Sequence, residues 1–136
     1  MGPHPITTPC TARCALTVCS PWQRCPLSPR VCGKCIFAGR TLHGGVTATL
    51  VDVVGTLALL GRDPTRAGVS VEMNQTFCAA AMEGSTIHIT GSILSYRRTL
   101  GFTEVTIREE PAADGTPGRV IAVGRHTKAF PQERRV

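Results

Sequence analysis

The sequence predicts a single α+β domain in which an antiparallel sheet wraps one long helix. A long apolar run, residues 42–60, is followed by four segments in which apolar and polar residues alternate. A chain of 136 residues is long enough for one compact domain and too short for two ordinary ones. Because one helix precedes consecutive strands joined by short turns, the pattern favours the α+β class.

The predicted helix, residues 42–60, is apolar around most of its circumference, and Gly61 and Pro64 are placed to end it. The run is too long for a typical strand and lacks a two-residue alternation. Its apolar part is nearer 15 residues than 20 and contains Asp52, which favours a buried core helix over a membrane span. One face carries small and polar residues at helical spacing, so a close neighbour is expected there. These residues are Gly45, Ala48, Thr49, Asp52, Gly55 and Thr56.

Four strands are predicted after the helix. In residues 69–77, Val69, Val71 and Met73 alternate with polar residues, and residues 85–96 alternate in the same way. Residues 100–108 and 119–128 form a third and a fourth strand, joined by the polar loop 109–118. We expect the first two strands to be half-buried, with one face on the core.

The charge is distributed unevenly between two parts of the chain. Residues 1–40 hold five of the fifteen basic residues and no acidic one, whereas the remainder holds ten basic and nine acidic residues. The formal charge of +6 is therefore +5 from the first part and +1 from the second, so no nucleic-acid partner is expected for the folded part. No secretory signal or membrane anchor is visible, and an intracellular soluble protein is expected.

The first forty residues contain six of the seven cysteines and six of the ten prolines. Cys32 and Cys35 have the spacing of half a zinc site, but no second half accompanies them, so no metal is expected. A disulfide scaffold would need an oxidising compartment, and the prolines interrupt the amphipathic helix of a mitochondrial transit peptide. We favour a segment 1–40 without a fixed structure, a folded domain over 41–130 and a basic tail over 131–136.

Asp52 is the first candidate for chemistry. A carboxylate within an apolar helix costs several kcal/mol unless it is paired, hydrated or neutralised. It acts either structurally, bonded to Thr49, Thr56 or a partner chain, or as a general base or nucleophile at a cleft.

The start of the helix is the second candidate. His43, Gly44 and Gly45 stand where free amides and the helix dipole can hold a developing oxyanion, although a plain glycine-rich helix start is the alternative. Eight residues separate Gly44 from Asp52, or about 12 Å along the axis. One reacting group cannot contact both residues of one chain, so a shared reaction requires a second copy, with two antiparallel helices across a twofold axis.

Four segments resemble one known family. LHGGVTATLVD at 42–52, GVSVEMNQTF at 68–77, TLGFTEV at 99–105 and GRHTK at 124–128 are similar to the PaaI-type thioesterases of hotdog fold, over about 95 residues. The resemblance implies a hotdog domain, a homo-oligomer built as a dimer of dimers, and medium-chain to long-chain fatty acyl-coenzyme A as substrate. No cofactor is expected, and the expected location is the cytoplasm, the mitochondrion or both.

The resemblance also assigns roles to residues. Asp52 corresponds to the family's general base or nucleophile, Gly44 to its oxyanion amide, and His43 to a residue that orients the site. Ser70, by itself an ordinary outward strand residue, corresponds to a group that positions the attacking water. The coenzyme A contacts implied are Ser70, Phe77, Ser95, Tyr96, Arg97, Arg98, Thr99 and Leu100. The last six of these form one segment, in which the guanidinium groups of Arg97 and Arg98 suit phosphate groups, although an exposed hairpin turn explains the two arginines equally well.

The sequence departs from the family upstream of Thr41. The family's N-terminal helix and first strand are not recognisable, so one edge of the sheet is expected to be unpaired. Phe37 stands where the family has an asparagine whose amide helps to hold the thioester carbonyl. Losing one oxyanion donor costs about 2.7 to 4 kcal/mol in a transition state. A weakened protein that binds acyl-coenzyme A, or serves as a scaffold, is therefore the alternative to an active enzyme.

Overall fold

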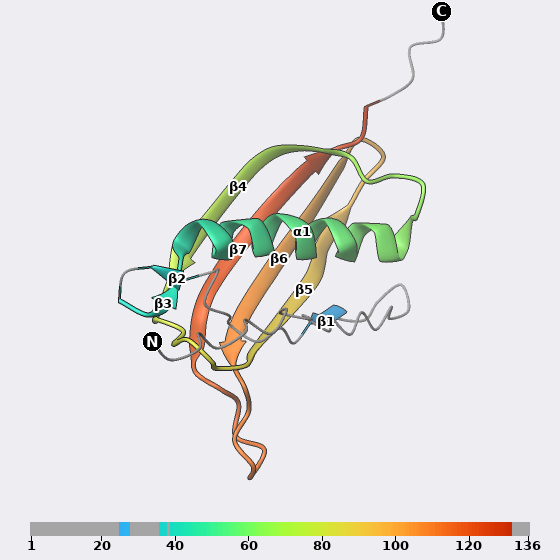
Figure 1. Ribbon diagram of the computed structural model, residues 1–136. Helices are drawn as coiled ribbons and strands as arrows, with labels where there is room; N and C mark the ends of the chain where they lie inside the picture. The colour runs from blue at the N-terminus through green and yellow to red at the C-terminus, as the bar shows by residue number, and fades with distance from the viewer. Residues whose placement is uncertain (1–24, 28–35, 38, 132–136) are drawn as a thin grey trace, which may run out of the picture.

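The computed structural model describes residues 25–27, 36–37 and 39–131, and in this part of the chain one helix lies across a curved antiparallel sheet (Figure 1). The sheet has the strand order β1-β5-β6-β7-β4, and β2 and β3 form a separate pair. All its pairings are antiparallel. The elements are β1 Cys25–Leu27, β2 Ile36–Phe37, β3 Thr41–Leu42, α1 Gly44–Arg62, β4 Val69–Phe77, β5 Ile87–Tyr96, β6 Leu100–Glu109 and β7 Val120–Ala129.

The four predicted long strands are confirmed, and the helix is confirmed with shifted ends. Leu42 belongs to β3 and donates its amide to the carbonyl of Ala81, so α1 begins only at Gly44. Gly61 does not end the helix as predicted. The helix continues to Arg62 because Asp63 caps it, donating its backbone N–H to the carbonyl oxygen of Leu59.

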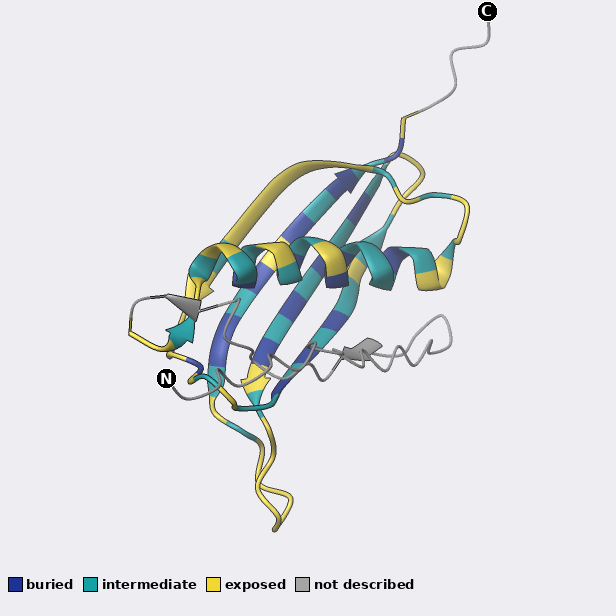
Figure 2. Ribbon diagram, viewed as in Figure 1, coloured by how far each residue is buried: buried dark blue, intermediate teal, exposed yellow. Residues whose placement is uncertain are grey.

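The hydrophobic core lies between α1 and the face of the sheet that the helix covers (Figure 2). β6 and β7 bury alternate residues, as the two-residue period of a strand requires. By length and composition α1 also qualifies as a membrane span, but its packing on the sheet makes it a core helix. The buried apolar residues are Val51, Val54, Leu59, Ala81, Ile87, Ile89, Val105, Ile107, Ile121, Ala122 and Phe130.

The helix approaches β7 closely at two glycines. A Cβ atom on Gly124 would lie 2.7 Å from both methyl groups of Val51, and one on Gly55 would lie 2.7 Å from the Thr103 hydroxyl and 3.1 Å from Nδ1 of His126. Gly55 is one of the small residues on the face where a close neighbour was expected, and at this position the neighbour is the sheet of the same chain. A small residue is needed there between helix and sheet.

β4 is the strand that departs from expectation, because it was predicted to be half-buried and is mostly exposed (Figure 2). Val69, Val71, Met73 and Phe77 are 43–62% exposed. β4 is the last strand of the sheet, so it has only β7 beside it within the described residues. An apolar edge strand of this kind is left uncovered by the rest of the described chain.

The other edge of the sheet is formed by β1, whose three residues pair with Ile89, Thr90 and Gly91 of β5. The edge that was expected to be unpaired is therefore covered over these three residues. Predictions about zinc ligands, disulfides, a transit peptide, an unstructured segment and the basic tail fall mostly on residues 1–24, 28–35 and 132–136, outside the described part of the chain.

We predict that Gly124→Ala lowers the free energy of unfolding by about 1 to 3 kcal/mol, because the new methyl group overlaps Val51 and forces helix and sheet apart. Urea denaturation followed by circular dichroism measures the change. Gly39→Ala is the control, since no atom lies within 4 Å of its added Cβ. An equal effect of both substitutions would contradict the close packing described above.

Candidate active site

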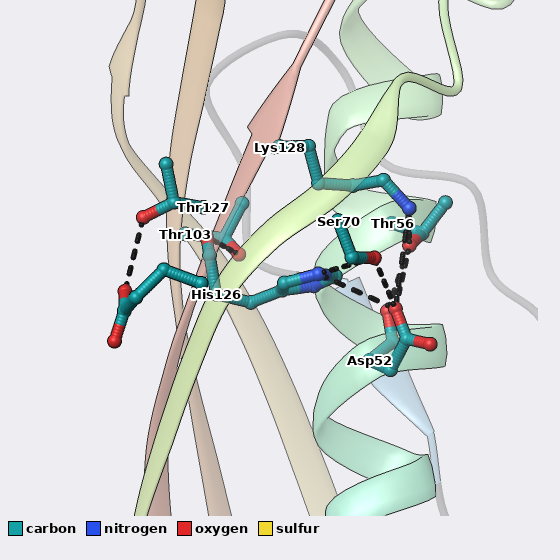
Figure 3. Close-up of polar contacts among 8 residues, drawn as sticks. Asp52, Thr56, Ser70, Thr103, His126, Thr127 and Lys128 are labelled. Atoms are coloured by element: carbon teal, nitrogen blue, oxygen red, sulfur yellow. Dashed lines mark hydrogen bonds and ion pairs between the residues drawn. The ribbon is translucent and has the colours of Figure 1, made fainter.

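Asp52 lies on the third turn of α1 and its carboxylate meets side chains from two strands (Figure 3). Oδ1 accepts a hydrogen bond from the Ser70 hydroxyl of β4 at 3.4 Å and lies 3.4 Å from Nε2 of His126 of β7. The side chain of Asp52 is 47% exposed, so the carboxylate is both paired with neighbouring side chains and open to solvent. Solvent hydrates one side of the carboxylate, which removes much of the cost of carrying its charge.

Ser70 reaches Asp52 because β4 contains a bulge. The pairing register of β4 with β7 shifts between Ser70 and Glu72, so Ser70 lies opposite Lys128 where a regular ladder would place Val71. Cross-strand partners share a face, and Lys128 points toward the helix. Sequence alternation placed Ser70 on the outward face, and the bulge reverses that placement.

His126 is buried beneath Asp52 and in contact with Ser70, whose oxygen lies 2.9 Å from Nε2. Burial lowers the pKa of His126 below its usual value of 6.5, the Asp52 charge opposes this, and the Lys128 charge adds to it. The imidazole is therefore neutral near pH 7. Since Nδ1 has no hydrogen-bond partner among the described residues, we place the proton on Nε2, which then donates to Ser70. Ser70 in turn donates to Asp52.

Lys128 supplies a buried positive charge to the same site, since its side chain is only 8% exposed. Its Nζ donates to the Thr56 hydroxyl at 2.9 Å and lies 3.9 Å from Oδ1 of Asp52. The Thr56 hydroxyl in turn donates to the backbone carbonyl of Asp52 at 2.8 Å. Lys128 therefore holds Asp52 both by its charge and through Thr56.

The start of α1, where the oxyanion amides were predicted, is a second region that is separate from Asp52. His43 is the N-cap, and its Nδ1 accepts the amide of Gly45 at 2.9 Å, so Gly45 does not offer the free amide that was expected. The amide of Gly44 has no acceptor within the described part of the chain. The ring of Phe77 lies over Gly44, and a Cβ atom added to Gly44 would be 3.1 Å from that ring. One amide and one exposed aromatic ring thus border this end of the helix.

The predicted coenzyme A segment lies in a third place, at the turn between β5 and β6. The amide of Arg97 donates to the carbonyl of Leu100 at 2.7 Å and closes the turn. Nε of Arg97 also donates to the hydroxyl of Ser95. The structure thus brings Asp52 and Ser70 together, and leaves Gly44 and the β5–β6 turn apart from them in the single chain.

His126 and Lys128 were not predicted as site residues. Within β7 they share the buried face with Ala122 and Gly124. Two polar residues on the apolar face of an alternating strand are a signal that the sequence did contain, because buried polar groups need partners. No group of three metal-ligating side chains occurs among the residues that the structure describes.

Comparison with known protein families gives a match over residues 39–115, which cover the helix and the strands β4 to β6. The matching family is the thioesterase superfamily. This chain belongs to it. The hotdog fold expected from the sequence is confirmed, because the helix wrapped by an antiparallel sheet matches solved thioesterases.

Individual thioesterases resemble the chain to different degrees. Human acyl-coenzyme A thioesterase 13 is 47% identical over 88 residues, which are 65% of this chain and 59% of that protein. The zebrafish thioesterase superfamily member 2 structure superposes with a TM-score of 0.76 at 38% identity, over 85% of this chain and 80% of the other. A Streptococcus pneumoniae thioesterase structure with coenzyme A, 19% identical, superposes with a TM-score of 0.70 over 82% and 80%. The chain thus spans less than two thirds of the curated relative.

We predict that His126 makes folding stability fall with acidity. Its pKa is depressed in the folded state, so below about pH 6.5 the unfolded chain binds the proton first, and stability is lost as the pH falls toward the folded-state pKa. Above about pH 6.5 the contribution of the neutral His126 to folding stability is fully present. Urea unfolding at several values between pH 7.5 and about 5 should show a decline, by at most about 1.4 kcal/mol per pH unit from this residue. The decline should be shallower in His126→Gln, and identical slopes would contradict the assignment.

Proposed function

We propose that this thioesterase-family chain hydrolyses acyl-coenzyme A, with medium-chain to long-chain fatty acyl groups as the substrate class. The observation that carries the proposal is the half-exposed Asp52 carboxylate held by Ser70 above a buried, neutral His126. A water molecule can reach one side of this carboxylate while the protein fixes the other. The coenzyme A in the Streptococcus pneumoniae structure and the name of the human relative support the ligand.

In the proposed reaction, Asp52 takes a proton from water as the water oxygen attacks the thioester carbonyl carbon. The carbonyl π electrons move to its oxygen, and the tetrahedral oxyanion is held by the amide of Gly44. When the carbonyl re-forms, the carbon–sulfur bond breaks and coenzyme A leaves as a thiolate, which takes up a proton. The products are a fatty acid and free coenzyme A. Ser70 orients the attacking water, and His126 orients Ser70.

A second copy of the chain is part of the proposal, because Gly44 and Asp52 lie on one helix about 12 Å apart. An antiparallel partner helix would bring its own Gly44 to this Asp52. The exposed surface beside Asp52 supports such a partner, since Thr49 and Val53 are exposed on the helix and the apolar side chains of β4 are uncovered. Association of two such dimers is the expected assembly.

The second candidate function is acyl-coenzyme A binding without efficient turnover. The sequence observation that favours it is Phe37, at the position where the resemblance to the PaaI-type thioesterases implies an asparagine. A phenyl ring cannot donate the lost hydrogen bond, which leaves the amide of Gly44 as the remaining expected donor. Steady-state hydrolysis separates the candidates, since a binding protein would retain affinity for coenzyme A esters with turnover near background.

We predict that Asp52→Asn lowers kcat for octanoyl-coenzyme A by about a hundredfold or more, because an amide cannot accept the proton from water. Thiol release with a chromogenic disulfide reagent measures the rate, and gel filtration checks that the assembly is unchanged. Asp114→Asn is the matched control, since this exposed carboxylate lies in the β6–β7 loop. Turnover of Asp52→Asn at the wild-type rate would exclude Asp52 as the base.

The shared site predicts complementation between two inactive variants. Gly44→Pro removes the oxyanion amide at the first helical position, where proline is well tolerated, and Asp52→Asn removes the base. In a mixed dimer one site combines the intact Gly44 of one chain with the intact Asp52 of the other. Co-expression of equal amounts should restore about a quarter of wild-type activity, because half the dimers are mixed and each has one working site. Absence of any recovery would contradict a site that combines Gly44 of one chain with Asp52 of the other.

A further inference from the structure

Lys128 is a buried cation on the face that β7 turns toward α1, and its side chain is 8% exposed. Removing an ammonium group from water costs several kcal/mol, which its partners must offset. The partners within the described chain are the Thr56 hydroxyl, 2.9 Å from Nζ, and the Asp52 carboxylate, 3.9 Å from it. The second distance is at the outer limit of an ion pair. Stability of the fold is therefore not a sufficient reason for a lysine at this position.

The contacts of the Asp52 carboxylate all end on one of its two oxygens (Figure 3). Oδ1 lies 3.4 Å from the Ser70 hydroxyl and 3.4 Å from Nε2 of His126. The same oxygen lies 3.9 Å from Nζ of Lys128 and 3.5 Å from the Thr56 hydroxyl. Oδ2 has no such contact with any residue that the structure describes. Each carboxylate oxygen has about two acceptor positions, so the protein occupies Oδ1 and leaves Oδ2 to solvent.

Thr56 connects Lys128 to the backbone of the helical turn that carries Asp52. An ammonium group can only donate hydrogen bonds, so the Thr56 hydroxyl accepts from Nζ and has one proton left to donate. The backbone carbonyl of Asp52 accepts this proton at 2.8 Å, which is closer than Oδ1 at 3.5 Å. Lys128 therefore acts on Asp52 in two ways, because its charge attracts Oδ1 and Thr56 fixes the backbone beneath the side chain.

These contacts restrict a carboxylate that could otherwise turn. The side chain of Asp52 is 47% exposed, so rotation about its side-chain bonds would exchange the two oxygens or carry both into solvent. Ser70 and Lys128 are opposite each other on β4 and β7, so Oδ1 is held from two neighbouring strands. A general base must stay within hydrogen-bond reach of the proton that it removes.

We infer that Lys128 is a positioning residue of the proposed hydrolysis: with Thr56 it holds Oδ1 of Asp52 against the protein, so that Oδ2 is the oxygen that takes the proton from the attacking water. The reaction itself rests on the proposed function, whereas the orientation of the carboxylate rests on the contacts described above. Lys128 acts through Asp52 and Thr56 and does not meet the thioester.

The kinetic test compares kcat and KM for octanoyl-coenzyme A in variants of the full chain. Lys128→Met removes the charge and keeps an unbranched side chain, so kcat should fall about tenfold while KM stays within about twofold. Thr56→Val removes the hydroxyl at similar shape and should also lower kcat, and Thr56→Ser should recover most of that loss. Arg125→Met is the matched control for a lost charge on β7, because Arg125 is exposed on the opposite face and pairs with Glu104.

Thermal melting separates positioning from a structural role. Lys128→Met removes the cost of burying an ammonium group, and the remaining charge of Asp52 is half in solvent. The melting temperature of Lys128→Met should therefore be no lower than that of the wild type, while kcat falls. A lowered melting temperature with an unchanged kcat would show that Lys128 serves the fold alone, and would overturn the inference.

A titration of His126 by nuclear magnetic resonance gives a readout that needs no turnover. Burial is the main cause that lowers the pKa of this imidazole, the charge of Asp52 on α1 raises it, the charge of Lys128 on β7 lowers it, and the charge of Glu72 on β4 raises it. Lys128→Met should therefore raise the pKa of His126, and Arg125→Met should leave it unchanged. No rise in Lys128→Met would show that the ammonium group does not face the site, and would overturn the inference.

The proposed function and the role of Lys128 can fail separately. A wild-type chain that does not hydrolyse acyl-coenzyme A would refute the proposed function, and the role of Lys128 in catalysis with it. Normal hydrolysis by the wild type with an unchanged kcat in Lys128→Met would refute the inference alone. A rise of KM in Lys128→Met at constant kcat would also overturn it, because it would assign Lys128 to substrate binding.

Discussion

The close approach of α1 to β7 is the constraint on which the candidate site depends. At Gly124 and Gly55 there is no room for a methyl group between helix and strand. This spacing allows side chains two and four residues further along β7 to reach the helix surface, where His126 and Lys128 meet Asp52 and Thr56. A helix held one methyl group further away would lose the short contacts that connect them, while the hydrophobic core could still form.

The polar side chains of the site differ in how deeply they are buried. His126 and Lys128 are buried, Ser70 is exposed, and Asp52 stands half in solvent between them. Because burial disfavours a charged imidazole, the deepest group is kept neutral and serves to orient, while the charges of Lys128 and Asp52 compensate each other nearer the surface. The arrangement leaves the carboxylate accessible without isolating a charge in the core.

The sequence predicted the long helix and the four long strands because periodicity and helix-ending residues are local signals. It also predicted that Gly44 and Asp52 cannot meet within one chain, since that follows from helix rise alone. It could not place Ser70, because a bulge changes which residues face the helix and leaves no mark in a two-residue alternation. The apolar residues of β4 were misassigned for a different reason. An alternation of apolar and polar residues indicates that one face of a strand is buried, but it does not indicate whether the same chain or a partner chain buries that face.

The loop between β6 and β7 projects from the end of the sheet, and residues 110–117 are exposed along its length (Figure 2). It holds its shape by its own contacts, with the amide of Thr116 bonded to Asp114 and that of Ala112 to the carbonyl of Thr116. Doubling the length of such a loop costs only about 0.6 kcal/mol in closure entropy. A peptide tag or a fluorescent reporter inserted here would therefore be carried by the fold at little thermodynamic expense, which offers a way to follow the intact protein in a living cell without altering either end of the chain.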